Sequence, residues 1–189
     1  MRSFLQSEEE VLMDYVAPAR PSDFQWHVVR VRANAEHQVA RSLACRDVEV
    51  FLPLQRNAGK RTPKRPLFPG YVFAGVTGRA VLPVVACPGV VHILCRGNVP
   101  EVVDPSEIFA LRTVAAQAHA LLPFPMFRCG ETVKIRQGPL ADVKGIVLRD
   151  EGRPRLVVSV SLLQRSVVAE VDREWLEKAE PMAWRVAGA

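Results

Sequence analysis

The sequence predicts an α+β protein with two units, a mixed unit of strands and helices followed by an all-β unit. Three observations predict this class. A β-rich run, WHVVRVR, is followed directly by a helical pattern. A capped helix begins at Asp104. Beyond residue 127, short β-type runs recur about every eight to twelve positions without helical periodicity, which is typical of a small barrel or sandwich.

The first unit is predicted to begin with a strand, a helix and a β-hairpin. Asn34 is expected to cap the helix, whose apolar stripe is Ala35, Val39 and Leu43. Gly, Pro, Asn and Thr punctuate the basic stretch RNAGKRTPKR, which therefore forms a loop at the hairpin tip. The expected ranges are 26–32 for the first strand, 34–44 for the helix, 48–54 and 66–74 for the hairpin strands, and 56–65 for the loop.

Two further helices and one more strand complete this unit. A short helix is expected over residues 79–86, with Pro83 in its first turn, and a strand over residues 90–96. The longer helix has Asp104 as N-cap, Pro105 at N1 and Glu107 at N3, which matches a capping box. Glu36 and His37 are interpreted as a pair on the surface of the earlier helix.

Several classes of protein and site are excluded by what the sequence lacks. The four cysteines show no C-x-x-C spacing, and the four histidines form no metal-ligand pattern with them. No nucleophile–base pair or phosphate-binding loop is present, so no catalytic residue, metal or cofactor is expected. Because there is neither a membrane-spanning run nor a secretory signal, we expect a cytoplasmic protein without a membrane partner.

The net charge of +5 is unevenly distributed. Residues 1–23 carry −3 and are expected to be a mobile acidic tail, whereas residues 24–122 carry +6 and residues 127–180 carry only +1. A basic surface attracts nucleic acid through its phosphates. The middle block is therefore the candidate for contact with nucleic acid, and the nearly neutral all-β unit is not expected to bind it strongly.

Two motifs in this order resemble one family. FPGY, residues 68–71, is similar to the signature of the N-terminal (NGN) domain of NusG-type transcription elongation factors, and GETVKIRQGPLADVKGIV, residues 130–147, to their KOW motif. The resemblance implies an antiparallel, ferredoxin-like sheet flanked by helices, joined to a five-stranded SH3-like barrel. The expected divisions are 1–23 tail, 24–121 NGN domain, 122–127 linker, 128–180 KOW barrel and 181–189 tail.

The resemblance also implies a monomer that binds the clamp helices of RNA polymerase through an apolar depression. Aromatic side chains anchor such interfaces well. The residues expected to form it are Phe68, Pro69, Gly70, Tyr71 and Phe73. Leu67, Val72 and Phe73 can equally be core residues of a strand.

The basic loop is expected to contact the phosphates of upstream or non-template DNA, where it would supply affinity without sequence choice. The residues concerned are Arg56, Lys60, Arg61, Lys64 and Arg65. The alternative is a solvated loop whose charge serves only solubility.

The KOW barrel of this family recruits partners such as ribosomal protein S10 or the terminator Rho. The resemblance places the contact at Leu162, Leu163, Gln164 and Arg165, expected to be exposed at a strand connection. Housekeeping NusG usually has an aromatic residue where Leu163 stands and a glycine where Gln164 stands. These two differences from housekeeping NusG argue against binding of Rho more than against binding of S10.

Three segments resemble the specialised UpxY/RfaH-like paralogues more closely than they resemble housekeeping NusG. They are PLFPGYVF, the GPL of the KOW motif and LLQRS. The main hypothesis is thus a non-enzymatic elongation factor that suppresses pausing and acts in antitermination. The alternatives are a housekeeping NusG that works with Rho and a KOW-type protein that binds ribosomes or RNA.

Overall fold

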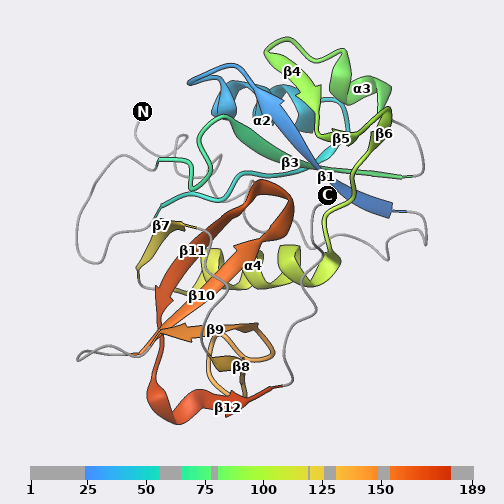
Figure 1. The fold of residues 1–189 in the computed structure, drawn as a ribbon. Helices are drawn as coiled ribbons and strands as arrows, with labels where there is room; N and C mark the ends of the chain where they lie inside the picture. The colour runs from blue at the N-terminus through green and yellow to red at the C-terminus, as the bar shows by residue number, and fades with distance from the viewer. Residues whose placement is uncertain are drawn as a thin grey trace, which may run out of the picture. The chain divides into compact units, whose positions relative to one another are not determined.

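The computed structural model describes residues 24–55, 65–77, 81–118, 120–125, 131–148 and 154–179. The chain forms two compact units, one made of Met1–Leu52 and Pro69–Val103, the other of Pro53–Phe68 and Asp104–Ala189. Each unit contains its own main sheet (Figure 1). The functional boundaries expected from the sequence, 24–121 and 128–180, stay predictions.

The first unit is built on a four-stranded antiparallel sheet in the order β2-β3-β1-β4. Its central strands, β3 and β1, are rich in valine and aromatic residues, which suits a pleated surface buried on both faces. The bounds are Phe24–Val31 for β1, Glu49–Phe51 for β2, Tyr71–Thr77 for β3 and Val90–Ile93 for β4. The strand expected over residues 90–96 is therefore wrong in its second half, because Cys95–Arg96 (β5) instead pairs with Val99–Pro100 (β6).

Two helices belong to this sheet. Helix α2, Glu36–Ala44, packs against β2 and β3, and the four-residue α3, Leu82–Val85, against β4. The prediction that Asn34 caps α2 is wrong. The N-cap is Ala35, and Asn34 instead adopts a left-handed φ of 60°, which asparagine tolerates better than most residues.

The predicted hairpin around the basic loop is confirmed at its base. Leu54 and Pro66 form a β-bridge, and the N–H of Gln55 donates to the carbonyl of Arg65 over 2.7 Å. The strand expected over residues 66–74 begins only at Tyr71, however. Gly70 has φ of +82°, a left-handed conformation that ends regular pairing, so FPG forms a turn that leads into β3.

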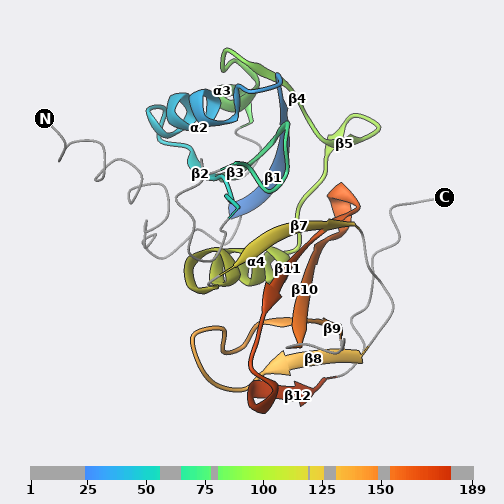
Figure 2. The same ribbon diagram turned by 90° about the vertical axis from the view of Figure 1, so that its left-hand side faces the viewer.

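The second unit is a six-stranded antiparallel sheet in the order β12-β8-β9-β10-β11-β7. In Figure 2, β7, β11 and β10 run side by side, while β8, β9 and β12 occupy the other end of the unit. The bounds are Leu121–Pro125 (β7), Glu131–Ile135 (β8), Lys144–Leu148 (β9), Arg155–Val160 (β10), Arg165–Glu170 (β11) and Leu176–Lys178 (β12). One strand more than expected is present, since β7 arises from the predicted linker.

A compact hydrophobic core holds this sheet together. Ile146, Val157 and Val168 are buried, and Phe124 and Leu148 pack against them. Gly145 is needed on β9 because a Cβ there would lie 2.5 Å from the carbonyl oxygen of Val157. Its role is thus to allow close approach of the two strands.

Helix α4, Pro105–Gln117, begins as predicted but only half of the capping box forms. The carboxylate of Asp104 accepts from the N–H of Ser106 at 2.8 Å. The carboxylate of Glu107 does not accept a hydrogen bond from the backbone N–H of Asp104, as it would in a complete capping box. It accepts instead from the N–H of Ser161 at 3.1 Å, and α4 packs against β10. A tertiary hydrogen bond has replaced the local one.

The predicted fold class, an antiparallel sheet flanked by helices followed by a small β domain, is confirmed. Two 3₁₀ turns, Ser161–Leu163 (η1) and Arg173–Trp175 (η2), complete the second unit. Among the residues that the structure describes, no helix has the length and apolar character needed to cross a membrane.

Candidate functional site

The FPGY motif contributes both core and surface side chains. Phe68 and Phe73 are almost completely buried, at 1% and 0% exposure, and Phe73 packs against Phe51 with 5.9 Å between the ring centroids. Pro69 is exposed and Tyr71 is half-buried. Of the five residues expected to bind the polymerase, Pro69 and Tyr71 therefore present side chains at the surface, while the side chains of Phe68 and Phe73 are buried.

Gly70 is held by a residue on helix α2. Its backbone N–H donates to the carboxylate of Glu36 over 2.7 Å, in a buried hydrogen bond between residues 34 positions apart. Glu36 is only 5% exposed, so its interpretation as half of a surface pair with His37 is wrong. A hydrogen bond to a charged acceptor is shorter and stronger than a neutral one, and this one fixes the turn at the start of β3.

Arg30, on β1, lies over the other side of this turn. Its guanidinium carbon is 4.9 Å from the centroid of the Tyr71 ring, within the range of a cation–π contact. A Cβ on residue 70 would lie only 2.7 Å from an Arg30 terminal nitrogen, Nη1. The absence of a side chain at Gly70 thus makes room for the guanidinium.

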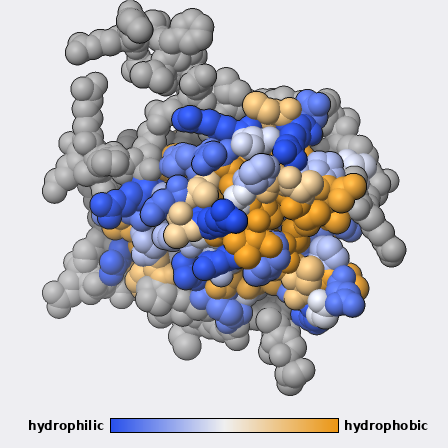
Figure 3. Space-filling view, turned by 90° about the horizontal axis from the view of Figure 1, so that it is seen from above, coloured by the Kyte–Doolittle hydropathy of each residue, from blue (hydrophilic) through white to orange (hydrophobic). Residues whose placement is uncertain are grey.

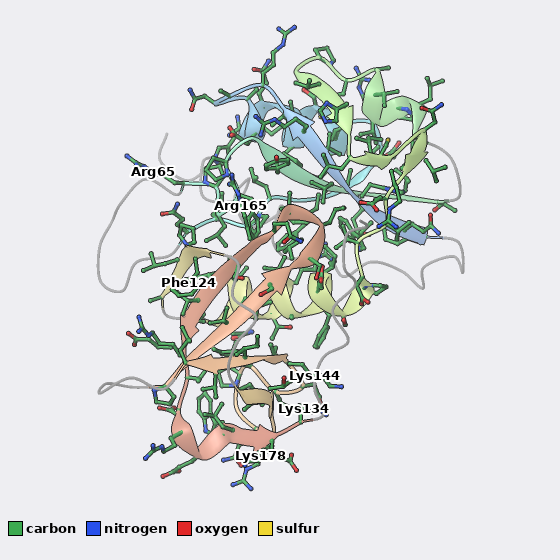
Figure 4. The ribbon with its side chains drawn as sticks, in the orientation of Figure 1. Arg65, Phe124, Lys134, Lys144, Arg165 and Lys178 are labelled. Carbon is green, nitrogen blue, oxygen red and sulfur yellow. The ribbon has the colours of Figure 1, made fainter. Side chains whose placement is uncertain are left out.

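Most of the predicted DNA-contacting residues lie outside the described part of the chain. These are Arg56, Lys60, Arg61 and Lys64. Arg65 is described and exposed, and its side chain projects outward from the ribbon in Figure 4. The backbone carbonyl of Arg65 accepts a hydrogen bond from the N–H of Gln55, and this bond closes the base of the hairpin.

The predicted partner site of the barrel lies at the connection between β10 and β11. Leu162 and Leu163 form part of η1 and are half-buried, whereas Gln164 and Arg165 are exposed. Gln164 has φ of 51° and its side chain donates to the carbonyl of Ser161 at 2.6 Å. The four residues are brought together in one tight turn, with the polar pair more accessible than the leucines.

Cationic side chains occur at the opposite end of the same sheet, where Figure 4 labels Lys134, Lys144 and Lys178. Lys134 and Lys144 are directly opposite each other on β8 and β9. Asp142 lies 2.6 Å from the Lys134 ammonium, and this hydrogen bond raises the pKa of Lys134 above its ordinary value. The acidic partner partly neutralises this end of the sheet, in keeping with the small net charge of the unit.

Hydrophobic side chains gather in one area of the face shown in Figure 3. Large apolar residues of the first unit that are exposed include Leu82, Val85, Val91 and Val99, the first at 73% and the last at 69%. They come from α3, β4 and β6.

The described residues offer no arrangement for metal binding. Within these ranges no three His, Cys, Asp or Glu side chains converge as ligands of one ion. The FPGY turn presents the exposed Pro69, the half-buried Tyr71 ring and the Arg30 guanidinium beside that ring.

Two residues of this site, Glu36 and Arg30, were missed by reasoning from the sequence. Glu36 lies three and seven positions before Val39 and Leu43, on the buried stripe of α2, which is an unusual place for a carboxylate. Arg30 follows Trp26 and Val28 at a spacing of two, on a strand face that is otherwise buried. Both signals were present in the sequence as charged residues on apolar faces.

Comparison with known proteins agrees with this architecture. A family model described as "Transcription termination factor nusG" matches residues 24–112. The chain is 29% identical to the transcription termination/antitermination protein NusG of Pseudomonas aeruginosa, with 82% of this chain and 98% of that protein covered. It is 30% identical to the protein of the same name from Escherichia coli K12, with 82% and 96% covered.

A solved structure, "Domain interaction in Thermotoga maritima NusG", has a similar fold. The TM-score is 0.51 at 23% identity, with 83% of this chain and 98% of that chain covered. The resemblance seen in the FPGY and KOW motifs is thus supported over nearly the whole length of its relatives, and this chain belongs to the NusG family.

Proposed function

We propose that this protein is a non-enzymatic transcription elongation and antitermination factor that binds the clamp helices of RNA polymerase through its FPGY turn. The observation that carries the proposal is the turn itself. Glu36 holds the N–H of Gly70, while Pro69 and Tyr71 present their side chains at the surface. A rigid turn with an aromatic anchor loses little entropy when it binds a helix.

In this proposal Pro69 and Tyr71 contact the polymerase directly. Gly70 contributes its backbone, while the rings of Phe68 and Phe73 are buried and are not direct contacts. Binding would favour the closed, elongating state of the polymerase over the paused state, which requires only differential affinity for the two states. The relatives carry termination and antitermination in their names, which supports a role in the same process.

The basic loop is proposed to contact DNA phosphates near the polymerase. Arg65 and the four cations outside the described residues would supply this attraction, with a strong dependence on salt. The barrel is proposed to recruit a partner such as ribosomal protein S10 through Leu162, Leu163, Gln164 and Arg165. A specialised, operon-selective paralogue that acts in the cytoplasm is the subclass that we favour.

The experiment is transcription by RNA polymerase through a pause site and a Rho-dependent terminator. Wild-type protein is compared with Tyr71→Ala and with the control Phe109→Ala, which removes an exposed aromatic ring from helix α4. We expect wild type and Phe109→Ala to shorten the pause, and Tyr71→Ala to lose this effect while keeping its fold.

The same reactions separate the alternatives. More read-through at the terminator supports an antiterminator, whereas earlier termination indicates a housekeeping factor that works with Rho. Absence of polymerase binding together with binding to ribosomal RNA would replace the proposal by the RNA-binding alternative.

A further inference from the structure

One row of side chains crosses three neighbouring strands of the first unit. Tyr71 on β3 lies opposite Arg30 on β1, and Arg30 lies opposite His92 on β4. Residues directly opposite in antiparallel strands point to the same face of the sheet. The sheet therefore presents an aromatic ring, a guanidinium and an imidazole side by side.

Arg30 is pre-oriented within this row. It is half-buried, its guanidinium lies 4.9 Å from the Tyr71 ring centroid, and the space beside it is left open by Gly70. Because these contacts restrict the side chain before any partner arrives, less conformational entropy is lost when it forms an ion pair. An arginine on an aromatic face is also well suited to bind a carboxylate with two parallel hydrogen bonds.

No carboxylate of the described residues forms an ion pair with Arg30. The carboxylate that reaches the same turn, Glu36, accepts from the Gly70 N–H and does not pair with the guanidinium. His92 and the nearby Arg32, both exposed, also have no acidic partner in the described ranges. A half-buried cation that loses more of its water on docking needs an anion from the other molecule.

We propose that Arg30 is a specificity-determining contact of this surface, which forms an ion pair with an acidic side chain on the polymerase helices that bind the FPGY turn. This inference rests on the proposed function, because Tyr71 belongs both to the proposed binding surface and to the row. The positive charge of Arg30 favours binding of a helix in which Asp or Glu flanks the apolar contact residues, over a helix that lacks such an acid.

A carboxylate on a helix fits this position better than a nucleic acid. Stacking of a base needs an accessible aromatic face, and one face of the Tyr71 ring is covered by Arg30. Pro69, which is exposed beside Tyr71, suits apolar contact with a helix and offers no donor to a phosphate.

The test measures equilibrium binding of the full-length chain to core RNA polymerase without nucleic acid, at several salt concentrations. The variants are Arg30→Gln and Arg30→Lys, with Arg41→Gln as matched control, since Arg41 is an exposed arginine on helix α2. Thermal unfolding of each variant establishes that it is folded. Tyr71→Ala is included as the separate test of the binding surface.

We expect Arg30→Gln to bind roughly tenfold more weakly and with a smaller dependence on salt, Arg30→Lys to recover part of the loss, and Arg41→Gln to match wild type. A charge reversal, Arg30→Glu, is expected to abolish binding, and replacement of the matching polymerase acid by lysine to restore it. A variant with merely structural damage would not be rescued in this way.

Two outcomes would overturn the inference while leaving the proposed function intact. In the first, Tyr71→Ala loses binding but Arg30→Gln binds with wild-type affinity and salt dependence. In the second, Arg30→Gln binds core polymerase normally and loses affinity only when a DNA scaffold is present, which would assign Arg30 to phosphate. If Tyr71→Ala binds core polymerase with wild-type affinity, the proposed function is wrong. The ion-pair inference, which rests on that function, is then wrong as well.

Discussion

The carboxylate of Glu36 accepts a hydrogen bond of 2.7 Å from the backbone N–H of Gly70 and thereby joins the first turn of helix α2 to the FPGY turn. Glu36 is the first residue of the helix, so its negative charge also lies at the positive end of the helix dipole. The glycine, in turn, has a left-handed φ and leaves space for Arg30. One carboxylate on helix α2 thus holds the backbone of the glycine in the proposed binding surface.

Replacement of Glu36 by alanine is expected to lower the free energy of unfolding by about 1–3 kcal/mol, because the buried N–H of Gly70 loses its acceptor. Glu36→Gln keeps an oxygen acceptor and should cost less. Urea unfolding followed by circular dichroism measures both. Gln38→Ala, an exposed change on the same helix, is the control and should lie within about 0.5 kcal/mol of wild type. Equal stabilities of Glu36→Ala and Gln38→Ala would contradict this role.

Gly70→Ala is expected to destabilise the protein by about 1–3 kcal/mol for two separable reasons. The left-handed φ of +82° is strained for alanine, and the new Cβ would lie 2.7 Å from the Arg30 guanidinium. In the double variant Gly70→Ala/Arg30→Ala the second cause is removed, so the two changes should couple in a double-mutant cycle measured by urea unfolding. Strict additivity of the two changes would show that Arg30 does not occupy the space beside Gly70.

Glu107 is expected to make stability depend on pH in a defined direction. Burial raises the pKa of its carboxyl, hydrogen bonds from Ser161 oppose this rise, and Asp104 adds to it. Since the folded-state pKa lies above the unfolded value, the folded state binds more protons, and stability falls as pH rises through the interval between the two values.

Comparison with Glu107→Gln isolates this effect, because glutamine can still accept from the Ser161 N–H without a charge. The variant should gain in stability relative to wild type as pH rises from about 4 through the raised pKa, and the difference should then stay constant. Urea unfolding at a series of pH values measures it. A difference that is independent of pH would contradict the raised pKa.

Gly145→Ala is expected to disrupt the sheet of the second unit. A Cβ at this position would lie 2.5 Å from the carbonyl oxygen of Val157 and 2.8 Å from Leu156 Cδ1, so β9 and β10 would have to separate. We expect a loss of about 2–4 kcal/mol, since backbone cannot move as easily as a side-chain tip. Gly97→Ala is the control, because nothing lies within 4 Å of its Cβ position and only its φ of +60° opposes alanine. Similar melting temperatures for the two variants would refute the close approach.

Local sequence signals predicted much of the fold. The N-cap at Asp104, the proline in the first turn of α3 and the valine-rich strands β1 and β10 each depend on residues close together in the chain. Such signals are read from spacing alone. The order of the FPGY and KOW motifs in one chain likewise indicates the family, because it depends on sequence alone.

The sequence by itself thus determined the α+β class, the position of most elements and the membership of the NusG family. Tertiary structure decided which charged residues lie inside: Glu36 bonds a glycine 34 positions away, and Glu107 bonds Ser161 in place of its own helix cap. It also turned part of the expected linker into β7, through pairing with β11. Local patterns report the preferences of near neighbours, whereas a carboxylate is buried only where a distant N–H comes within reach to compensate its lost hydration.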